Sequence, residues 1–223
     1  MGVLRYPLFF MATISYGTST ELDAVNSILM SVGESPVNTL TVQSPEVAIA
    51  QKTLQQVCRE VQAEGWVFNT EHEYPIELDS SNHCVVPQNV LEIDLSHARH
   101  GDHFHVTRRT VGGITKLYDN IEHQYNFENV NESKLYCDII WMLEFEDLPQ
   151  VFKDYITVRA SRISSNRMVN DPNASELIGT DEQLARALAV EYDTRVADHN
   201  IFSNQEYRTN PASVYRPYQV INR

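Results

Sequence analysis

The pattern of apolar and polar positions near the start of the chain predicts a helical hairpin over residues 18–68. The first helix of this hairpin begins at Thr18, which Glu21 follows at the spacing of a capping box. Gly33 ends the helix, because glycine tolerates the positive φ of the residue that follows a helix. The apolar positions recur at helical spacing and are Leu22, Val25, Ile28, Leu29 and Val32.

The second helix of the hairpin begins at Ser44, Pro45 and Glu46. These residues supply a hydroxyl cap, a proline where no N–H is needed, and an acid at the positive end of the helix dipole. Its apolar stripe is Val47, Ala50, Leu54, Val57, Cys58 and Val61. Gly65 ends the helix, and residues 66–68 (Trp-Val-Phe) are expected to leave it as a buried extended segment.

Residues 69–146 change to the two-residue alternation that is typical of strands. The predicted strands are residues 74–78, 83–86, 90–95, 104–111, 114–118, 125–127 and 135–145. Gly112 and Gly113 supply the positive φ values of a tight hairpin turn. Residues 139–143 are apolar throughout, so this stretch is expected in a central strand that is buried on both faces.

Helical spacing returns after Pro149, and the apolar ladder of the third helix is Phe152, Ile156, Ala160 and Ile163. Residues 170–172 (Asn-Asp-Pro) break that helix, and Asp171 caps a final helical region. The apolar stripe of this last region is Leu184, Leu188, Tyr192 and Val196. A second capping box from Thr180 to Gln183 leaves open whether the region is one helix or two helices that meet at Gly179.

These elements predict an α+β fold with a discontinuous four-helix bundle and an inserted β domain. Four helices with one apolar face each are most easily covered by packing together. The bundle is expected to contain residues 18–68 and 147–202, and the mostly antiparallel β domain residues 69–146. Residues 1–17 are expected to form an N-terminal tail and residues 203–223 an extended C-terminal arm.

Composition narrows the classes of function. The formal net charge of −13 argues against a protein that grips phosphates across a broad face, because such proteins cluster Lys and Arg. Cys58, Cys84 and Cys137 are scattered, which favours buried thiols in a reducing compartment over disulfides or zinc. No membrane span is expected, since no apolar run approaches about 18 residues. Arg5 alone before the apolar residues 8–14 is too little charge for a signal peptide, and Met11 offers an alternative start that would make residues 1–10 incidental.

Two clusters of side chains could suggest a metal site and a catalytic pair, and each has a simpler structural explanation. His97, His100, His103 and His105 match no metal-ligand spacing and lie among arginines, so a solvated hairpin tip is expected and no metal. Glu144 and Glu146 would share one strand face and could form a pair of carboxylates for acid–base work on a glycoside. Acids also gather harmlessly where a strand leads into a helix. No nucleophile motif, phosphate-binding loop or cofactor motif is present, and neither catalysis nor a cofactor is expected.

Two groups of residues are candidates for contacts with partners. Residues 203–223 have too few apolar side chains for a core of their own, yet they contain Tyr207, Tyr215 and Tyr218. Tyrosine offers large contact area and a hydrogen bond at low entropic cost, which suits an interface. Arg159 and Arg162 are weaker candidates, because pairing with acids of the fourth helix or of a neighbouring molecule would satisfy them.

Three stretches carry a resemblance to a known family. These are ELDAVNSILMSVGESPVNTL, the helix that ends in EGWVFN, and EDLPQVFKDYITVRASR. Together they resemble the tail tubular protein A family, the head-to-tail adaptor or gatekeeper proteins of short-tailed, podovirus-type bacteriophages. The resemblance covers roughly residues 18–200, while the first 17 residues, the histidine-rich hairpin and the tyrosine arm match no family motif.

The resemblance implies a structural virion protein of the phage tail, assembled in the host cytoplasm. It implies a twelve-subunit ring below the portal protein that docks the tail nozzle (tail tubular protein B), with tail fibre proteins attached nearby. Genomic DNA would pass through the ring without sequence-specific binding. A tail-associated glycan hydrolase that uses Glu144 and Glu146, and a connector that binds DNA, are the alternatives that this reading leaves open.

Overall fold

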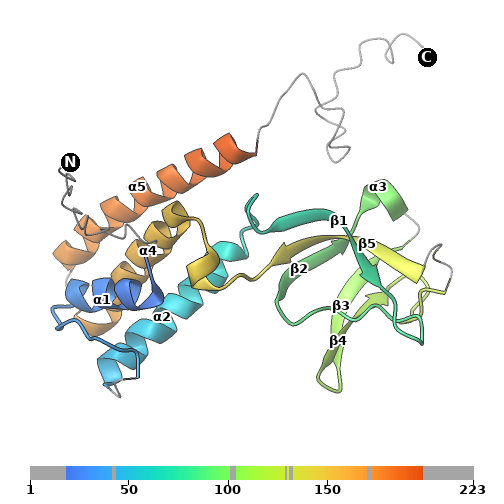
Figure 1. The fold of residues 1–223 in the computed structure, drawn as a ribbon, viewed down its shortest axis with the longest axis horizontal. Helices are drawn as coiled ribbons and strands as arrows, with labels where there is room; N and C mark the ends of the chain where they lie inside the picture. Colours follow the sequence, from blue (N-terminus) through green and yellow to red (C-terminus); the bar gives the residue numbers. More distant parts are fainter. Residues whose placement is uncertain are drawn as a thin grey trace, which may run out of the picture.

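The computed structural model describes residues 19–41, 44–100, 104–128, 130, 133–169 and 172–197. Long helices lie at one end and antiparallel strands at the other (Figure 1), so the predicted mixed α+β class is confirmed. The helices are α1 (Glu21–Ser31), α2 (Pro45–Gln62), α3 (His97–His100), α4 (Gln150–Met168) and α5 (Pro172–Val196), with a short 3₁₀ helix at Phe145–Asp147. The strands are β1 (Thr70–Glu77), β2 (Val90–Leu95), β3 (Val106–Val111), β4 (Ile114–Asp119) and β5 (Lys134–Trp141).

Helix α1 begins two residues later than predicted. Its capping box joins Thr20 and Asp23, because the Asp23 N–H donates to Thr20 Oγ1 at 3.2 Å and the Thr20 N–H donates to Asp23 Oδ2 at 3.0 Å. Thr18 lies outside the described residues. The predicted end is confirmed: Gly33 has φ +83°, and the next residue's N–H bonds Leu29 O at 2.9 Å, which closes the helix.

Helix α2 begins where it was predicted to begin, but its cap differs from the prediction. Ser44 is the N-cap residue, yet its hydroxyl donates to the Glu46 carboxylate and makes no capping bond with the backbone. The segment after α2 was predicted to be extended, and this is wrong. Residues 67–69 form a turn in which the Asn69 N–H donates to Trp66 O at 3.1 Å, and Val67 is exposed.

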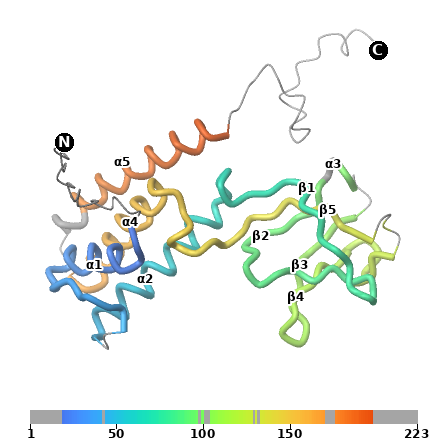
Figure 2. The backbone as a smooth tube through the Cα atoms, in the orientation of Figure 1, coloured from blue at the N-terminus to red at the C-terminus, as the bar shows by residue number. Residues whose placement is uncertain are grey.

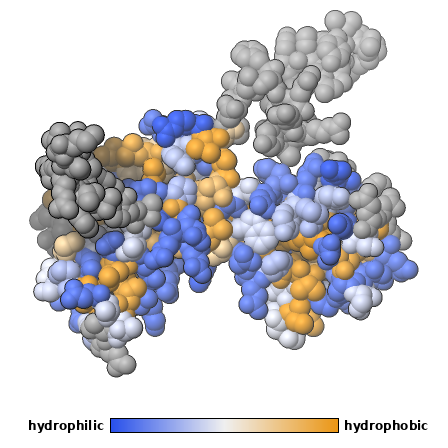
Figure 3. Space-filling view, viewed as in Figure 1, coloured by the Kyte–Doolittle hydropathy of each residue, from blue (hydrophilic) through white to orange (hydrophobic). Residues whose placement is uncertain are grey.

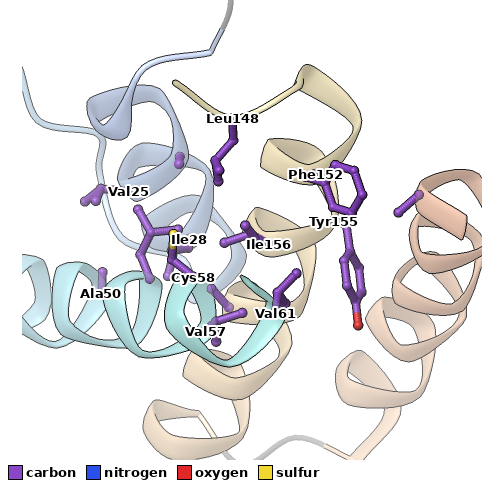
Figure 4. Close-up of a cluster of buried hydrophobic side chains, with 14 of the residues drawn as sticks. Val25, Ile28, Ala50, Val57, Cys58, Val61, Leu148, Phe152, Tyr155 and Ile156 are labelled. Carbon is purple, nitrogen blue, oxygen red and sulfur yellow. The ribbon is translucent and has the colours of Figure 1, made fainter. Parts of the chain in front are cut away.

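Helices α1, α2, α4 and α5 share one hydrophobic core. Figure 4 shows side chains of α1, α2 and α4 meeting there, and α5 lies beside Tyr155. The ring of Phe152 is central: its centroid lies 4.8 Å from the ring centroid of Trp66 and 4.5 Å from that of Phe68. The predicted apolar stripe of α2 is buried throughout, and of the predicted ladder of α4, Phe152, Ile156 and Ala160 are buried. Covering these faces is what holds the helices together.

The strands form a three-stranded sheet in the order β1-β5-β2 and a two-stranded sheet of β3 and β4. Strand β5 is central, as predicted, but it is not buried on both faces. Its burial alternates along the strand, with Leu135, Cys137 and Ile139 facing a second hydrophobic core. It also ends at Trp141, four residues earlier than predicted. The strands predicted at 83–86 and 125–127 make isolated bridges instead.

Helix α5 is continuous, and of its predicted apolar stripe only Tyr192 packs against the core. Gly179 lies within the helix, and the Thr180 hydroxyl donates to Glu176 O at 3.2 Å instead of capping a new helix. Ala185, Ala189 and Tyr192 face the core, whereas Leu184, Leu188 and Val196 are exposed. Small alanine side chains let the α5 backbone lie close to the core, and this selects the face that is buried. The predicted cap Asp171 lies outside the described residues.

The chain passes between the helices and the sheets twice, after α2 and after β5 (Figure 2), and polar side chains join the two crossings. Gln62 is fully buried; its Nε2 donates to Leu143 O at 3.0 Å, and Leu143 N–H donates to Gln62 Oε1 at 2.8 Å. Asn69 Nδ2 donates to Trp141 O at 2.9 Å and to Gln62 O at 2.9 Å. We call Gln62 and Asn69 the junction residues. Nothing in the sequence pattern indicated this role.

Candidate interaction surfaces

Arg159 and Arg162, which the sequence suggested as interface residues, lie on α4 and pair with acids within the chain. Arg159 Nη2 lies 3.4 Å from a carboxylate oxygen of Glu60 on α2, and Nη1 lies 3.5 Å from one of Glu64 in the turn that follows α2. Arg162 Nε pairs with Glu182 on α5. The expectation that acids of the last helix would satisfy these arginines is therefore confirmed for Arg162. The ion pairs connect three helices.

Tyr155 anchors the same network from the core. Its side chain is 1% exposed, and its hydroxyl accepts hydrogen bonds from Arg159 Nη1 at 3.1 Å and from Arg186 Nη1 at 3.0 Å. Arg186 also donates from Nη2 to Glu64 at 3.0 Å. The bond to Tyr155 and the nearby negative charge of Glu64 raise the pKa of Arg186. Both arginines are charged at neutral pH, as arginine side chains in proteins are.

A cavity of about 440 Å³ lies between α4 and α5. Its lining consists of Tyr155, Arg159, Arg162, Gly179, Glu182, Gln183 and Arg186. Three guanidinium groups around one hollow are an arrangement that binds carboxylates or phosphates. Here the three positive charges face three carboxylates, those of Glu60, Glu64 and Glu182, so the network is already close to neutral. The arrangement stabilises the packing of the helices and leaves little charge for a ligand.

The histidine-rich segment was predicted to be the tip of a hairpin, and this is wrong: residues 97–100 form the short helix α3, and the strands on either side, β2 and β3, belong to different sheets. Residues 101–103 lie outside the described residues. The His100 imidazole accepts from the Tyr136 N–H through Nε2 at 2.9 Å, and burial lowers its pKa. His105 Nδ1 lies 3.0 Å from Asn120 Nδ2. His103 and the side chain of His97 lie outside the description. Among the described residues, no group of three or more His, Cys, Asp or Glu is placed to hold a metal ion.

Glu144 and Glu146 do not share a strand face, which corrects the sequence prediction. The strand ends before them, Glu144 caps the 3₁₀ helix Phe145–Asp147, and Glu146 lies within that helix. Both side chains are exposed, and neither lines the cavity between α4 and α5. The backbone carbonyl of Glu146 accepts from the buried Lys153 Nζ at 2.6 Å. This segment positions the start of α4.

The outer face of α5 carries three exposed leucines, and the sequence had assigned two of them, Leu184 and Leu188, to the core. Leu177, Leu184 and Leu188 are 72%, 62% and 51% exposed. Asp181 and Glu191 continue the same face, because the five positions follow one another at steps of four and three residues. Neither acid forms an ion pair among the described residues. We call these five residues the α5 outer face; it is apolar and acidic, and the exposed Arg195 follows it four residues beyond Glu191.

The turn between β3 and β4 carries a second exposed apolar group. Gly112 and Gly113 have φ +60° and +81°, as the predicted tight turn requires, and Val111 and Ile114 pair beside them. These two side chains are 56% and 51% exposed, and Figure 3 shows apolar surface at this end of the hairpin. A single residue pattern could have indicated it: two β-branched residues flanking a Gly-Gly turn.

Basic side chains lie on the same face of this hairpin. In the register of β3 and β4, Arg109 lies opposite Lys116, two positions further from the turn than Val111 and Ile114. Side chains two positions apart on a strand share a face, so Arg109 and Lys116 project on the same side as Val111 and Ile114. Arg109 stacks over Tyr118, 3.6 Å from the ring centroid, and forms no ion pair with a described carboxylate. Lys116 Nζ lies 3.9 Å from Asp79. We call these four residues the hairpin tip.

The remaining predicted interface residues, Tyr207, Tyr215 and Tyr218, lie outside the described residues. Within the described part of the chain, no helix is both long and apolar enough to cross a membrane. The sequence model of one protein family, described as Tube, tail tubular protein, matches residues 22–199. No curated protein matches the chain at a significant level.

Proposed function

The chain belongs to the tail tubular protein family, and from this membership we propose that it is the adaptor that joins the portal protein to the tail nozzle. The family is one of structural proteins of the phage tail, so the protein is a component of the virion tail and associates with other tail or portal proteins. The finer assignment is a ring of twelve subunits that lines the DNA exit channel. Tail tubular protein B would bind below it, with tail fibres nearby.

Two features of the chain support this proposal. An adaptor needs one surface toward each axial partner, and the helical core and the β core lie at opposite ends of the molecule (Figure 1). We assign residues 18–68 and 147–202 to a helical bundle domain and residues 69–146 to a β domain. The net charge of −13 suits a channel through which DNA slides without binding.

The termini and the tyrosines complete the proposal. Residues 203–223 would act as an arm that docks on a neighbouring subunit or on the portal through Tyr207, Tyr215 and Tyr218. The first 17 residues would form a tail outside both domains. Arg159 and Arg162 would contribute to an interface indirectly, by holding α2, α4 and α5 in the arrangement that the partner meets.

The proposal is tested by mixing the protein with its portal ring and measuring the mass of the complex by native mass spectrometry. Full-length protein and a chain ending at Phe202 are compared. Twelve copies that bind only when the arm is present would support both the adaptor and the arm. Twelve copies with either chain would keep the adaptor and refute the arm. The absence of any complex would refute the adaptor assignment.

A separate measurement addresses the contact with DNA. A channel that lets DNA slide predicts no measurable binding of duplex DNA, even at low salt, where phosphate contacts are strongest. A steep, salt-dependent affinity for duplex DNA would contradict the proposed channel and favour a DNA-binding connector.

A further inference from the structure

Two exposed apolar groups of the described chain have no partner, and their charges are opposite. The α5 outer face combines Leu177, Leu184 and Leu188 with the acids Asp181 and Glu191. The hairpin tip combines Val111 and Ile114 with the bases Arg109 and Lys116. Exposed apolar side chains rimmed by charge are typical of surfaces that bind another protein.

The two surfaces cannot cover each other within one chain. Figure 1 places α5 along one edge of the molecule and the β3–β4 turn at the opposite edge. Neither surface is covered by the described part of the chain, so each is available to another molecule. Opposite charge on surfaces at opposite edges is the arrangement that joins copies of one chain head to tail.

Pairing of α5 with α5 of another copy is disfavoured by charge. The steps of four and three residues along the α5 outer face resemble the seam of a coiled coil. An antiparallel pair centred near residue 186 would place Asp181 opposite Glu191, and a parallel pair would place each acid opposite itself. Like charges that face each other across a seam are destabilising. A partner for this face should therefore be apolar and basic, as the hairpin tip is.

We propose that the hairpin tip of one subunit docks on the α5 outer face of the next subunit. Val111 and Ile114 would pack between the leucines, while Arg109 meets Asp181 or Glu191. The contact is heterologous, so each subunit offers one of each surface and successive contacts generate a ring or a filament. This inference deepens the proposed ring, on which it rests, by naming the surfaces that join its subunits.

The contact between two isolated copies should be weak. A hairpin end laid on a helix covers less than the roughly 1,200 Å² of a standard stable interface. Many such contacts, closed into a ring or held on a portal, would act together. A covalent trap for the transient pair is therefore a sharper test than the oligomeric state alone.

The test uses full-length protein with Ile114→Cys and Leu188→Cys in the same chain, oxidised with copper phenanthroline. The native cysteines are buried and should not react. Head-to-tail docking predicts a ladder of dimers, trimers and larger species on a non-reducing gel. Each single variant should form dimers at most. A matched control pairs Leu188→Cys with Ile121→Cys, which is equally exposed but lies outside the hairpin tip, and should form no ladder.

A charge exchange tests the specificity of the contact. Arg109→Glu in the double-cysteine chain should reduce the ladder at least tenfold, and adding Asp181→Lys and Glu191→Lys should restore it. No ladder, or an equal ladder with Ile121→Cys, would overturn the inference. If both introduced cysteines are protected from disulfide formation only when portal is added, the inference is also overturned, and the two surfaces are assigned to contacts with the portal. Because binding of twelve copies to the portal is measured separately, this inference can fail while the adaptor function stands.

Discussion

The junction residue Gln62 is predicted to be one of the most sensitive positions of the protein. Its buried amide donates to the Leu143 carbonyl and accepts from the Leu143 N–H, at 3.0 and 2.8 Å. Gln62→Leu keeps the size of the side chain but leaves both backbone groups without a partner. Each unsatisfied buried group costs about 1–3 kcal/mol, and Leu143 is half-buried, so we expect a loss of about 2–4 kcal/mol of unfolding free energy.

The measurement is urea unfolding followed by circular dichroism and by tryptophan fluorescence. Trp66 packs in the helical core and Trp141 ends the central strand, so fluorescence reports on both sides of the junction. At about 2–4 °C per kcal/mol, the melting temperature should fall by about 4–16 °C. Gln56→Leu is the matched control, because Gln56 lies on the same helix with its amide exposed to solvent. It should cost less than about 0.5 kcal/mol.

Gln62→Glu separates the hydrogen bonds from packing. The carboxylate still accepts from the Leu143 N–H but faces the Leu143 carbonyl, so burial and this carbonyl should raise the pKa of the new carboxyl above its usual value. A group with a raised pKa in the folded state loses stability as pH rises through that value. The deficit relative to wild type should therefore be large at pH 7 and shrink toward pH 4. A deficit independent of pH, or a loss with Gln62→Leu no greater than with Gln56→Leu, would refute the reasoning.

Three further predictions concern backbone, cap and thiols. Gly65→Ala should cost about 1–3 kcal/mol in urea unfolding, because φ is +74° and the terminal methyl Ile140 Cδ1, 2.8 Å from the new Cβ, would have to shift. Gly33→Ala, with positive φ but open space, should cost about 1 kcal/mol, and equal losses would show that the contact with Ile140 adds nothing. Thr20→Ala removes the capping box of α1 and should cost about 1 kcal/mol, whereas Thr20→Ser should cost almost nothing; equal losses would show that the cap is not the cause. All three cysteines are buried and form no disulfide, and burial raises the pKa of the Cys58 thiol. A thiol reagent at pH 8 should therefore label the folded protein only as fast as the protein unfolds. One fast-reacting native thiol would contradict the described core.

Local features of the fold could be predicted because their signals lie within a few residues. The stop of α1 follows from Gly33, the start of α2 from Ser44 and Pro45, and the hairpin turn from Gly112 and Gly113. Each requires a backbone conformation that few other residues adopt. Where a local prediction was wrong, the element was shifted by a few residues: the capping box of α1 lies at Thr20 and was predicted at Thr18.

The choice of the buried face of α5 could not be predicted, because both of its faces are apolar. Leucine has the larger hydrophobic surface, so the sequence favoured Leu184 and Leu188 as core residues. The structure buries Ala189 instead and leaves the leucines exposed. The available space beside α4 and Tyr155 decides this, and that space depends on helices far away in the sequence.

The sequence by itself determined the fold class, the positions of most helices and strands, and the family, because periodicity, caps and motifs are local properties of the chain. Only the tertiary structure decided which groups meet. It joined Gln62 to Leu143, and it assembled arginines of α4 and acids of α2 and α5 around Tyr155. It also placed the α5 outer face and the hairpin tip at opposite edges of the molecule. Such pairings depend on distances between residues far apart in the chain, and no pattern of neighbouring residues records them.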